Sequence, residues 1–109
     1  MSTGPERAIE QHLAALVRAA GGIAYKWSSP GRPGVPDRLV ILPGAPARVI
    51  GVEVKAPGKR PTVLQARVLA ALAALGVEVA VVDSRAAAQA LVASVAPEAA
   101  STSSCARKK

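Results

Sequence analysis

Three charged residues near the middle of the chain lie in or beside apolar runs, where charge is unusual. Asp37 precedes the apolar run 39–42, and Glu53 and Lys55 close a second run that begins at Val49. A turn rich in proline and glycine separates the runs and predicts an antiparallel strand pair. Because side chains alternate along a strand, Glu53 and Lys55 share one face, where Asp37 can meet them. Burying charges is costly, so this cluster needs a reason.

Metal-dependent hydrolysis of a phosphodiester is the chemistry that such a cluster could perform. Carboxylates on adjacent strands make a hard oxygen site suited to Mg²⁺ or Mn²⁺. Asp37 and Glu53 would be the principal ligands, with the carbonyl of Val54 between them. Lys55 would orient the attacking water or offset charge in the transition state. The structural alternative is an ion pair on an exposed strand, worth less than about 1 kcal/mol.

The elements that must position these residues follow from the apolar periodicity. In chain order we expect a helix over 4–20, strands over 23–28, 39–42 and 49–54, a helix over 62–76, a strand over 77–83 and a helix after Ser84. The near-continuous apolar runs indicate strands covered on both faces by helices. The helical crossover before the last strand predicts parallel pairing with the Glu53 strand.

The charged cluster also carries a resemblance to known nucleases. Pro36-Asp37 followed by Glu53-Val54-Lys55 resembles the signature of the PD-(D/E)xK superfamily, and the strings 29–39 and 52–59 resemble its virus-type replication-repair nuclease (VRR-NUC) branch more narrowly. The resemblance covers about residues 9 to 83. It implies an α/β, restriction-endonuclease-like αβββαβ core, with a central mixed sheet flanked by helices.

The resemblance further implies an activity and a partner. It indicates an endonuclease that uses Mg²⁺ or Mn²⁺ to hydrolyse DNA, with branched substrates such as Holliday junctions, a homodimeric assembly, and a setting in DNA repair and in phages. Two competing interpretations stay open: a nuclease-fold DNA-binding module that no longer cuts, and a basic interaction protein acting through its tail.

Three further residues have two interpretations each. The resemblance implies that Glu10 adds an acidic group to the metal site, whereas a solvated helix carboxylate is the alternative. It implies a catalytic role for Gln65, which could instead close a capping box with Thr62. Glu6 fits best as the capping partner of Thr3.

The charge balance favours a polyanionic partner. The chain carries 14 Lys and Arg against 7 Asp and Glu, a net charge of +7. Tyr25 and Trp27 are its only aromatic residues, which are too few for a base-stacking platform. The composition therefore favours a protein that recognises the DNA backbone. The predicted phosphate contacts are Lys26, Arg32, Lys59 and Arg60, although Lys26 could equally point into water.

Length and composition set the remaining expectations. The 109 residues suit one nuclease domain over 1–96, followed by a basic tail over 97–109 that is predicted to be disordered. No apolar stretch approaches the roughly 20 residues of a membrane span, and the start lacks the features of a secretion signal. A single cysteine, Cys105, excludes an intrachain disulfide. We therefore expect the protein to lie in the cytoplasm of a bacterial or phage-infected host cell.

Overall fold

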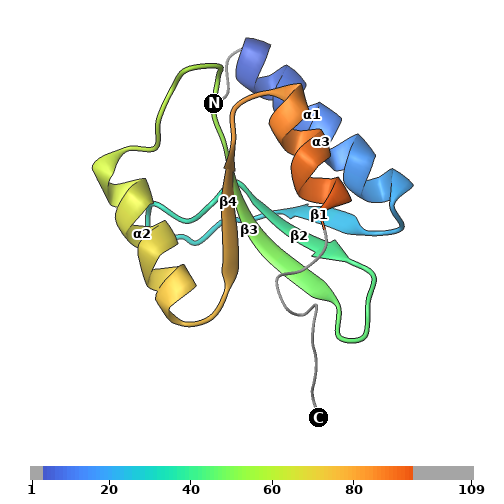
Figure 1. The fold of residues 1–109 in the computed structure, drawn as a ribbon. Helices are drawn as coiled ribbons and strands as arrows, with labels where there is room; N and C mark the ends of the chain where they lie inside the picture. Colours follow the sequence, from blue (N-terminus) through green and yellow to red (C-terminus); the bar gives the residue numbers. More distant parts are fainter. Residues whose placement is uncertain (1–3, 95–109) are drawn as a thin grey trace.

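A four-stranded mixed sheet with helices on both sides forms the body of the protein (Figure 1). The computed structural model describes residues 4–94, so Thr3 and the tail lie outside the described part. The elements are α1 (Gly4–Ala19), β1 (Ile23–Lys26), β2 (Arg38–Leu42), β3 (Arg48–Val54), α2 (Val63–Ala74), β4 (Glu78–Val82) and α3 (Arg85–Ala93). Their order confirms the predicted αβββαβ core with a closing helix. None of the helices described is long and apolar enough to cross a membrane.

The strands lie in the order β1-β2-β3-β4. β1 with β2 and β2 with β3 are antiparallel, whereas β4 runs parallel to β3 after the α2 crossover. Both pairings that the sequence predicts, the antiparallel pair around the proline-rich turn and the parallel pair after the helix, are therefore confirmed.

One face of the sheet packs against α1 and α3 and forms the core (Figure 1). Alternate residues along β2, β3 and β4 point to this side, because side chains alternate along a strand. The buried cluster consists of Ile9, Leu13, Val17, Val40, Leu42, Ile50, Val52, Val54, Val82 and Ala88. The residues between these on each strand, including Glu53, therefore point to the side on which α2 lies.

The α2 side is covered less fully than the apolar runs predict. Leu69 is the one buried residue of α2, and Leu75, which follows the helix, is 82% exposed. Among the sheet residues of this side, Ile23, Val49 and Val81 are also exposed. Helices lie on both sides of the sheet as predicted, but α2 makes most of its sheet contacts with the edge strand β4 and leaves part of this side exposed.

The loop between β1 and β2 fills part of this side and sets the position of Asp37. A side chain at Gly51 would come within 3.2 Å of Pro36 and 3.3 Å of Trp27, so glycine permits the loop to lie on the sheet. The backbone N–H of Trp27 donates to the carbonyl of Asp37 at 3.0 Å. The loop thus brings Asp37 to the start of β2 beside the sheet face that carries Glu53.

Candidate active site

Asp37, Glu53 and Lys55 come together at one end of the β2–β3 pair. Arg38 pairs with Val52 in the register, so Asp37 lies opposite the end of β3. The backbone N–H of Val54 donates to Oδ2 of Asp37 at 2.8 Å. Nζ of Lys55 lies 3.3 Å from Oε2 of Glu53. The structure therefore places the predicted central trio in one small region, and the catalytic and metal-binding roles of the three stay predictions.

Glu53 is the most unusual member of this group. It is 1% exposed, and its Oε1 has no hydrogen-bond partner among the described residues. Burial, and secondly the charge of Asp37, raise the pKa of Glu53 to about 7, while Lys55 offsets part of this rise. An unpartnered buried carboxylate oxygen beside a second carboxylate is destabilising by itself. A divalent cation would relieve both effects, so these side chains fit the metal that the resemblance implies.

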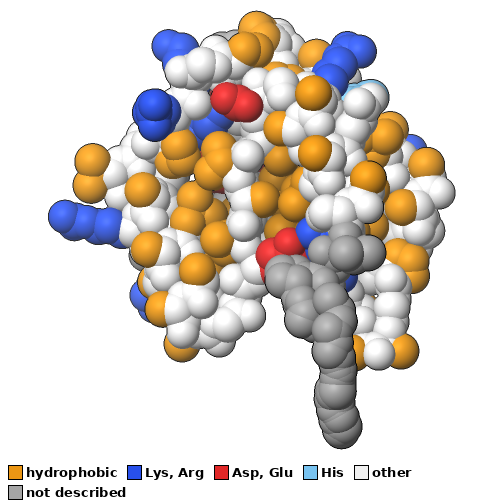
Figure 2. All heavy atoms as spheres, in the orientation of Figure 1, with side chains coloured by type: hydrophobic (Ala, Val, Ile, Leu, Met, Phe, Trp, Pro, Cys, Tyr) orange, Lys and Arg blue, Asp and Glu red, His pale blue; other side chains and the backbone are white. Residues whose placement is uncertain are grey.

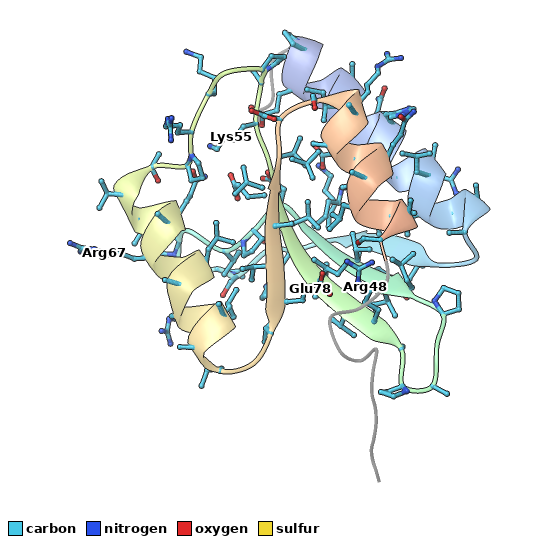
Figure 3. All side chains as sticks on the ribbon, in the orientation of Figure 1. Arg48, Lys55, Arg67 and Glu78 are labelled. Carbon is cyan, nitrogen blue, oxygen red and sulfur yellow. The ribbon has the colours of Figure 1, made fainter. Side chains whose placement is uncertain are left out.

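Lys55 is held by its backbone as well as by Glu53. Its N–H donates to the carbonyl of Val82 at 2.9 Å, which extends the β3–β4 pairing by one residue. Its side chain is mostly buried, and it points from the end of β3 to the side on which α2 lies (Figure 3). The ammonium is thereby fixed next to the carboxylate of Glu53.

Glu10 does not join this group in the structure. Its Oε2 lies 2.7 Å from Nε of Arg38 and 3.3 Å from Nζ of Lys26. Because Arg38 follows Asp37 in the chain, the two side chains start from opposite faces of β2. Within residues 4–94, no three His, Cys, Asp or Glu side chains are grouped so that they could hold a metal ion. The metal-ligand role of Glu10 stays a prediction.

Glu6 is the acidic residue of α1 that acts on the site electrostatically. Its charge adds to the rise in the pKa of Glu53. The capping role expected for Glu6 depends on Thr3, which lies outside the described residues. The sequence favours the capping role for Glu6. Glu6 and Glu10 are four residues apart and therefore share a helix face, and this spacing is the sequence signal that relates Glu6 to the acidic group expected from α1.

Gln65 forms the capping box of α2. Its Oε1 accepts a hydrogen bond from the backbone N–H of Thr62 at 2.9 Å, and its own N–H donates to Oγ1 of Thr62 at 3.1 Å. The capping role of Gln65 is therefore present in the structure, and its catalytic role stays a prediction.

The four predicted DNA contacts come from β1, the β1–β2 loop and the segment that follows β3. Lys26, on the edge strand β1, is 73% exposed despite its contact with Glu10. Arg32 is exposed in the β1–β2 loop. Lys59 and Arg60 line a hollow of about 460 Å³ that also includes Val81 and Asp83. Figure 2 shows basic side chains spaced around the rim of an apolar surface on this view.

Comparisons with known proteins agree with this fold. No family model matches the chain. A solved structure described as a VRR_NUC domain superposes with a TM-score of 0.76 and 32% identity, covering 83% of this chain and 96% of that chain. "Putative nuclease p44" of Acyrthosiphon pisum secondary endosymbiont phage 1 is 58% identical over 80 residues, which are 73% of this chain and 84% of that protein.

The class of protein follows from these observations. A mixed sheet that carries Asp37, Glu53 and Lys55 at the end of one strand pair, in a fold shared with a VRR_NUC structure, defines a nuclease domain. The chain belongs to the VRR-NUC family.

Proposed function

We propose that this protein is a DNA endonuclease that requires Mg²⁺ or Mn²⁺. The observation that carries the proposal is the buried Glu53, whose Oε1 has no partner among the described residues although Asp37 and Lys55 lie beside it. Such a carboxylate is costly in a protein that never binds a cation there. The relative named as a nuclease and the VRR-NUC fold support the same activity.

Each residue of the site has a distinct task in this proposal. Asp37, Glu53 and the carbonyl of Val54 would hold the ion, which when bound neutralises phosphate charge and lowers the pKa of a water molecule. Asp37 is held for this task by its hydrogen bond from the N–H of Val54. Lys55, fixed 3.3 Å from Glu53, would orient the attacking water and offset negative charge as it develops on the phosphate.

The substrate we propose is branched DNA, recognised through its backbone. The net charge of +7 and the scarcity of aromatic residues favour phosphate contacts over base stacking. Lys59 and Arg60 would contact phosphates next to the site, because they line the same hollow as Asp83, which follows β4 beside Lys55. Lys26 and Arg32 would contact DNA farther along the β1 side.

A homodimer is the assembly we propose for a branched substrate, because two strands must be cut. An apolar row supports it: Ile23, Ile41 and Val49 are paired across β1, β2 and β3 on the side of the sheet opposite the core. Ile23 and Val49 are exposed, and so is Leu75 at the end of α2. Apolar surface of this kind, without charged side chains in the row, is typical of contacts between protein chains.

Labelled Holliday junctions, flaps, nicked duplexes and plain duplexes test the proposal. With Mg²⁺ or Mn²⁺ we expect cleavage that is fastest on a branched substrate, and none with a chelator. Arg67→Ala is a suitable control, because Arg67 points away from the sheet on α2 (Figure 3) and the variant should cleave like the parent. Binding of DNA without cleavage under all metal conditions would favour the inactive DNA-binding module instead.

A further inference from the structure

The ion pair between Glu10 and Arg38 has no place in the chemistry described above. Glu10 is 6% exposed, and its Oε2 accepts from Nε of Arg38 at 2.7 Å. Lys26 approaches the same oxygen at 3.3 Å from the surface. A carboxylate this deeply buried needs a partner, and Arg38 is the one that is also mostly buried.

Arg38 is anchored to two elements at once. Besides Glu10 on α1, it donates from Nη1 to the carbonyl of Ala24 on β1 at 2.8 Å. Its side chain is 16% exposed, so these bonds are largely shielded from water. Two directed bonds from one planar guanidinium fix both the position and the orientation of the side chain.

Fixing Arg38 also fixes Asp37, because the two are adjacent at the start of β2. Asp37 points to the opposite face, where the N–H of Val54 donates to its Oδ2. The carbonyl of Asp37 accepts from Trp27. The residue is therefore held from three sides: the end of β3, the β1–β2 loop and, through Arg38, α1.

We propose that Glu10 and Arg38 form a positioning pair that holds Asp37 in place for the cation, and that Glu10 is not itself a ligand. This inference rests on the proposed function, in which Asp37 holds the ion. To reach a cation beside Asp37, Glu10 would have to break its ion pair with Arg38. The mostly buried guanidinium of Arg38 would then lose the one carboxylate that it contacts among the described residues. Residues that orient metal ligands from behind commonly change metal affinity when they are substituted.

A double-mutant cycle on Mn²⁺ affinity, measured by calorimetry with the full chain, tests the pair. We expect Glu10→Gln and Arg38→Gln each to weaken Mn²⁺ binding by about ten-fold, and the double variant to be no weaker than either single variant. A direct ligand behaves differently, since Glu10→Gln would then weaken binding by the same factor whether or not Arg38 is present. Independent, multiplying effects would overturn the inference, and so would unchanged affinity in both single variants.

Two controls make the outcome specific. Lys26→Met removes the exposed cation from the same carboxylate and should change Mn²⁺ affinity by less than about two-fold. Arg38→Lys keeps the charge but loses the planar fork, so it should weaken Mn²⁺ binding like Arg38→Gln while folding more readily.

Asp37→Asn separates this inference from the proposed function. If it leaves Mn²⁺ affinity unchanged, the metal assignment fails, and the positioning pair fails with it. If Asp37→Asn abolishes Mn²⁺ binding while the effects at 10 and 38 multiply independently, only the positioning pair is wrong.

Discussion

The backbone N–H of Val54 donates to Oδ2 of Asp37 at 2.8 Å, and this bond joins the carboxylate that directly precedes β2 to the last residue of β3. The antiparallel register makes this contact available, since Arg38 pairs with Val52. Two acids and an ammonium are thereby gathered at the end of one strand pair. Their charge balance should make the stability of the protein depend on pH and on a bound cation.

The metal-free protein should lose stability as the pH rises through the pKa of Glu53. This pKa is about 7 in the folded protein, against an ordinary value of 4.5. Between pH 4.5 and 7 the folded state keeps a proton on Glu53 that the unfolded state releases. The stabilisation that this proton provides is therefore complete below pH 4.5, falls between pH 4.5 and 7 and is absent above pH 7. The loss is on the order of 3 kcal/mol.

Glu53→Gln should remove this pH dependence, because an amide does not titrate. In EDTA at about pH 8 the variant should be more stable than the parent, as measured by urea unfolding, and near pH 4.5 the two should be similar. Added Mn²⁺ should stabilise the parent but not the variant. A parent whose stability is flat between about pH 5 and 8 would contradict the raised pKa.

Arg48→Ala should be strongly destabilising, although Arg48 lies outside the site. Nε and Nη2 of Arg48 bind both carboxylate oxygens of Glu78, at 2.8 and 2.6 Å, and Nη1 donates to the carbonyls of Leu91 and Ser94 (Figure 3). The side chain thus joins β3, β4 and the end of α3. Breaking a mostly buried pair of this kind costs about 3 kcal/mol.

Urea unfolding of Arg48→Ala, Arg48→Lys and the exposed control Arg85→Ala measures this effect. We expect Arg48→Lys to fall between the parent and Arg48→Ala, because an ammonium can pair with Glu78 but cannot also reach the end of α3. Equal stability of Arg48→Ala and Arg85→Ala would show that the Arg48 side chain contributes nothing.

The two interpretations of Gln65 can be separated by pairing it with Thr62. Both hydrogen bonds of the capping box depend on these side chains, so Thr62→Ala and Gln65→Ala should each lower the free energy of unfolding by about 1 kcal/mol. The predicted catalytic role requires more: cleavage at low temperature should be abolished in Gln65→Ala and kept in Thr62→Ala. Equal cleavage by both variants would show that Gln65 has only the capping role.

Lys59 and Arg60 should contribute to DNA affinity by neutralising phosphates. Replacing both with alanine should weaken binding for all sequences and make the slope of log K against log[salt] shallower, by roughly 0.9 for each phosphate that the variant no longer neutralises. A salt titration by fluorescence anisotropy measures this slope, with Arg67→Ala as the matched control. An unchanged slope in the double variant would show that the DNA does not contact Lys59 and Arg60.

The apolar row should govern self-association. Val49→Asp puts a charge at an exposed end of this row and should convert a dimer into a monomer in light scattering coupled to size exclusion. Ala15→Asp, on the exposed side of α1, is the control that should leave the mass unchanged. A monomeric parent across the working concentration range would rule out the homodimer.

Much of this architecture could be predicted because the signals are local. The proline-rich turn, the capping box of Thr62 and Gln65 and the cap at Ser84 each depend on a few neighbouring residues, and the structure contains all three. The strand alternation likewise places Glu53 and Lys55 together. Local signals determine element order well, and here the order agrees with the family resemblance.

What could not be predicted depends on relations between distant segments. Glu6 and Glu10 share one helix face, and only the position of Arg38 from β2 shows which of them is engaged in an ion pair. The exposure of Leu75 depends on how far α2 reaches over the sheet, which an apolar stripe does not encode. The hydrogen bonds of Arg48 join residues up to 46 positions apart, so no short pattern marks them.

Single-turnover cleavage of a labelled Holliday junction, in Mg²⁺, by the parent and by Lys55→Met is the most direct test of the proposed site. Lys55→Met keeps most of the length of the side chain and removes the ammonium that lies 3.3 Å from Glu53. We predict that the variant binds the junction within a few-fold of the parent but cleaves it at least about 100-fold more slowly. Cleavage at the parental rate by Lys55→Met would contradict the assignment of Asp37, Glu53 and Lys55 as the active site.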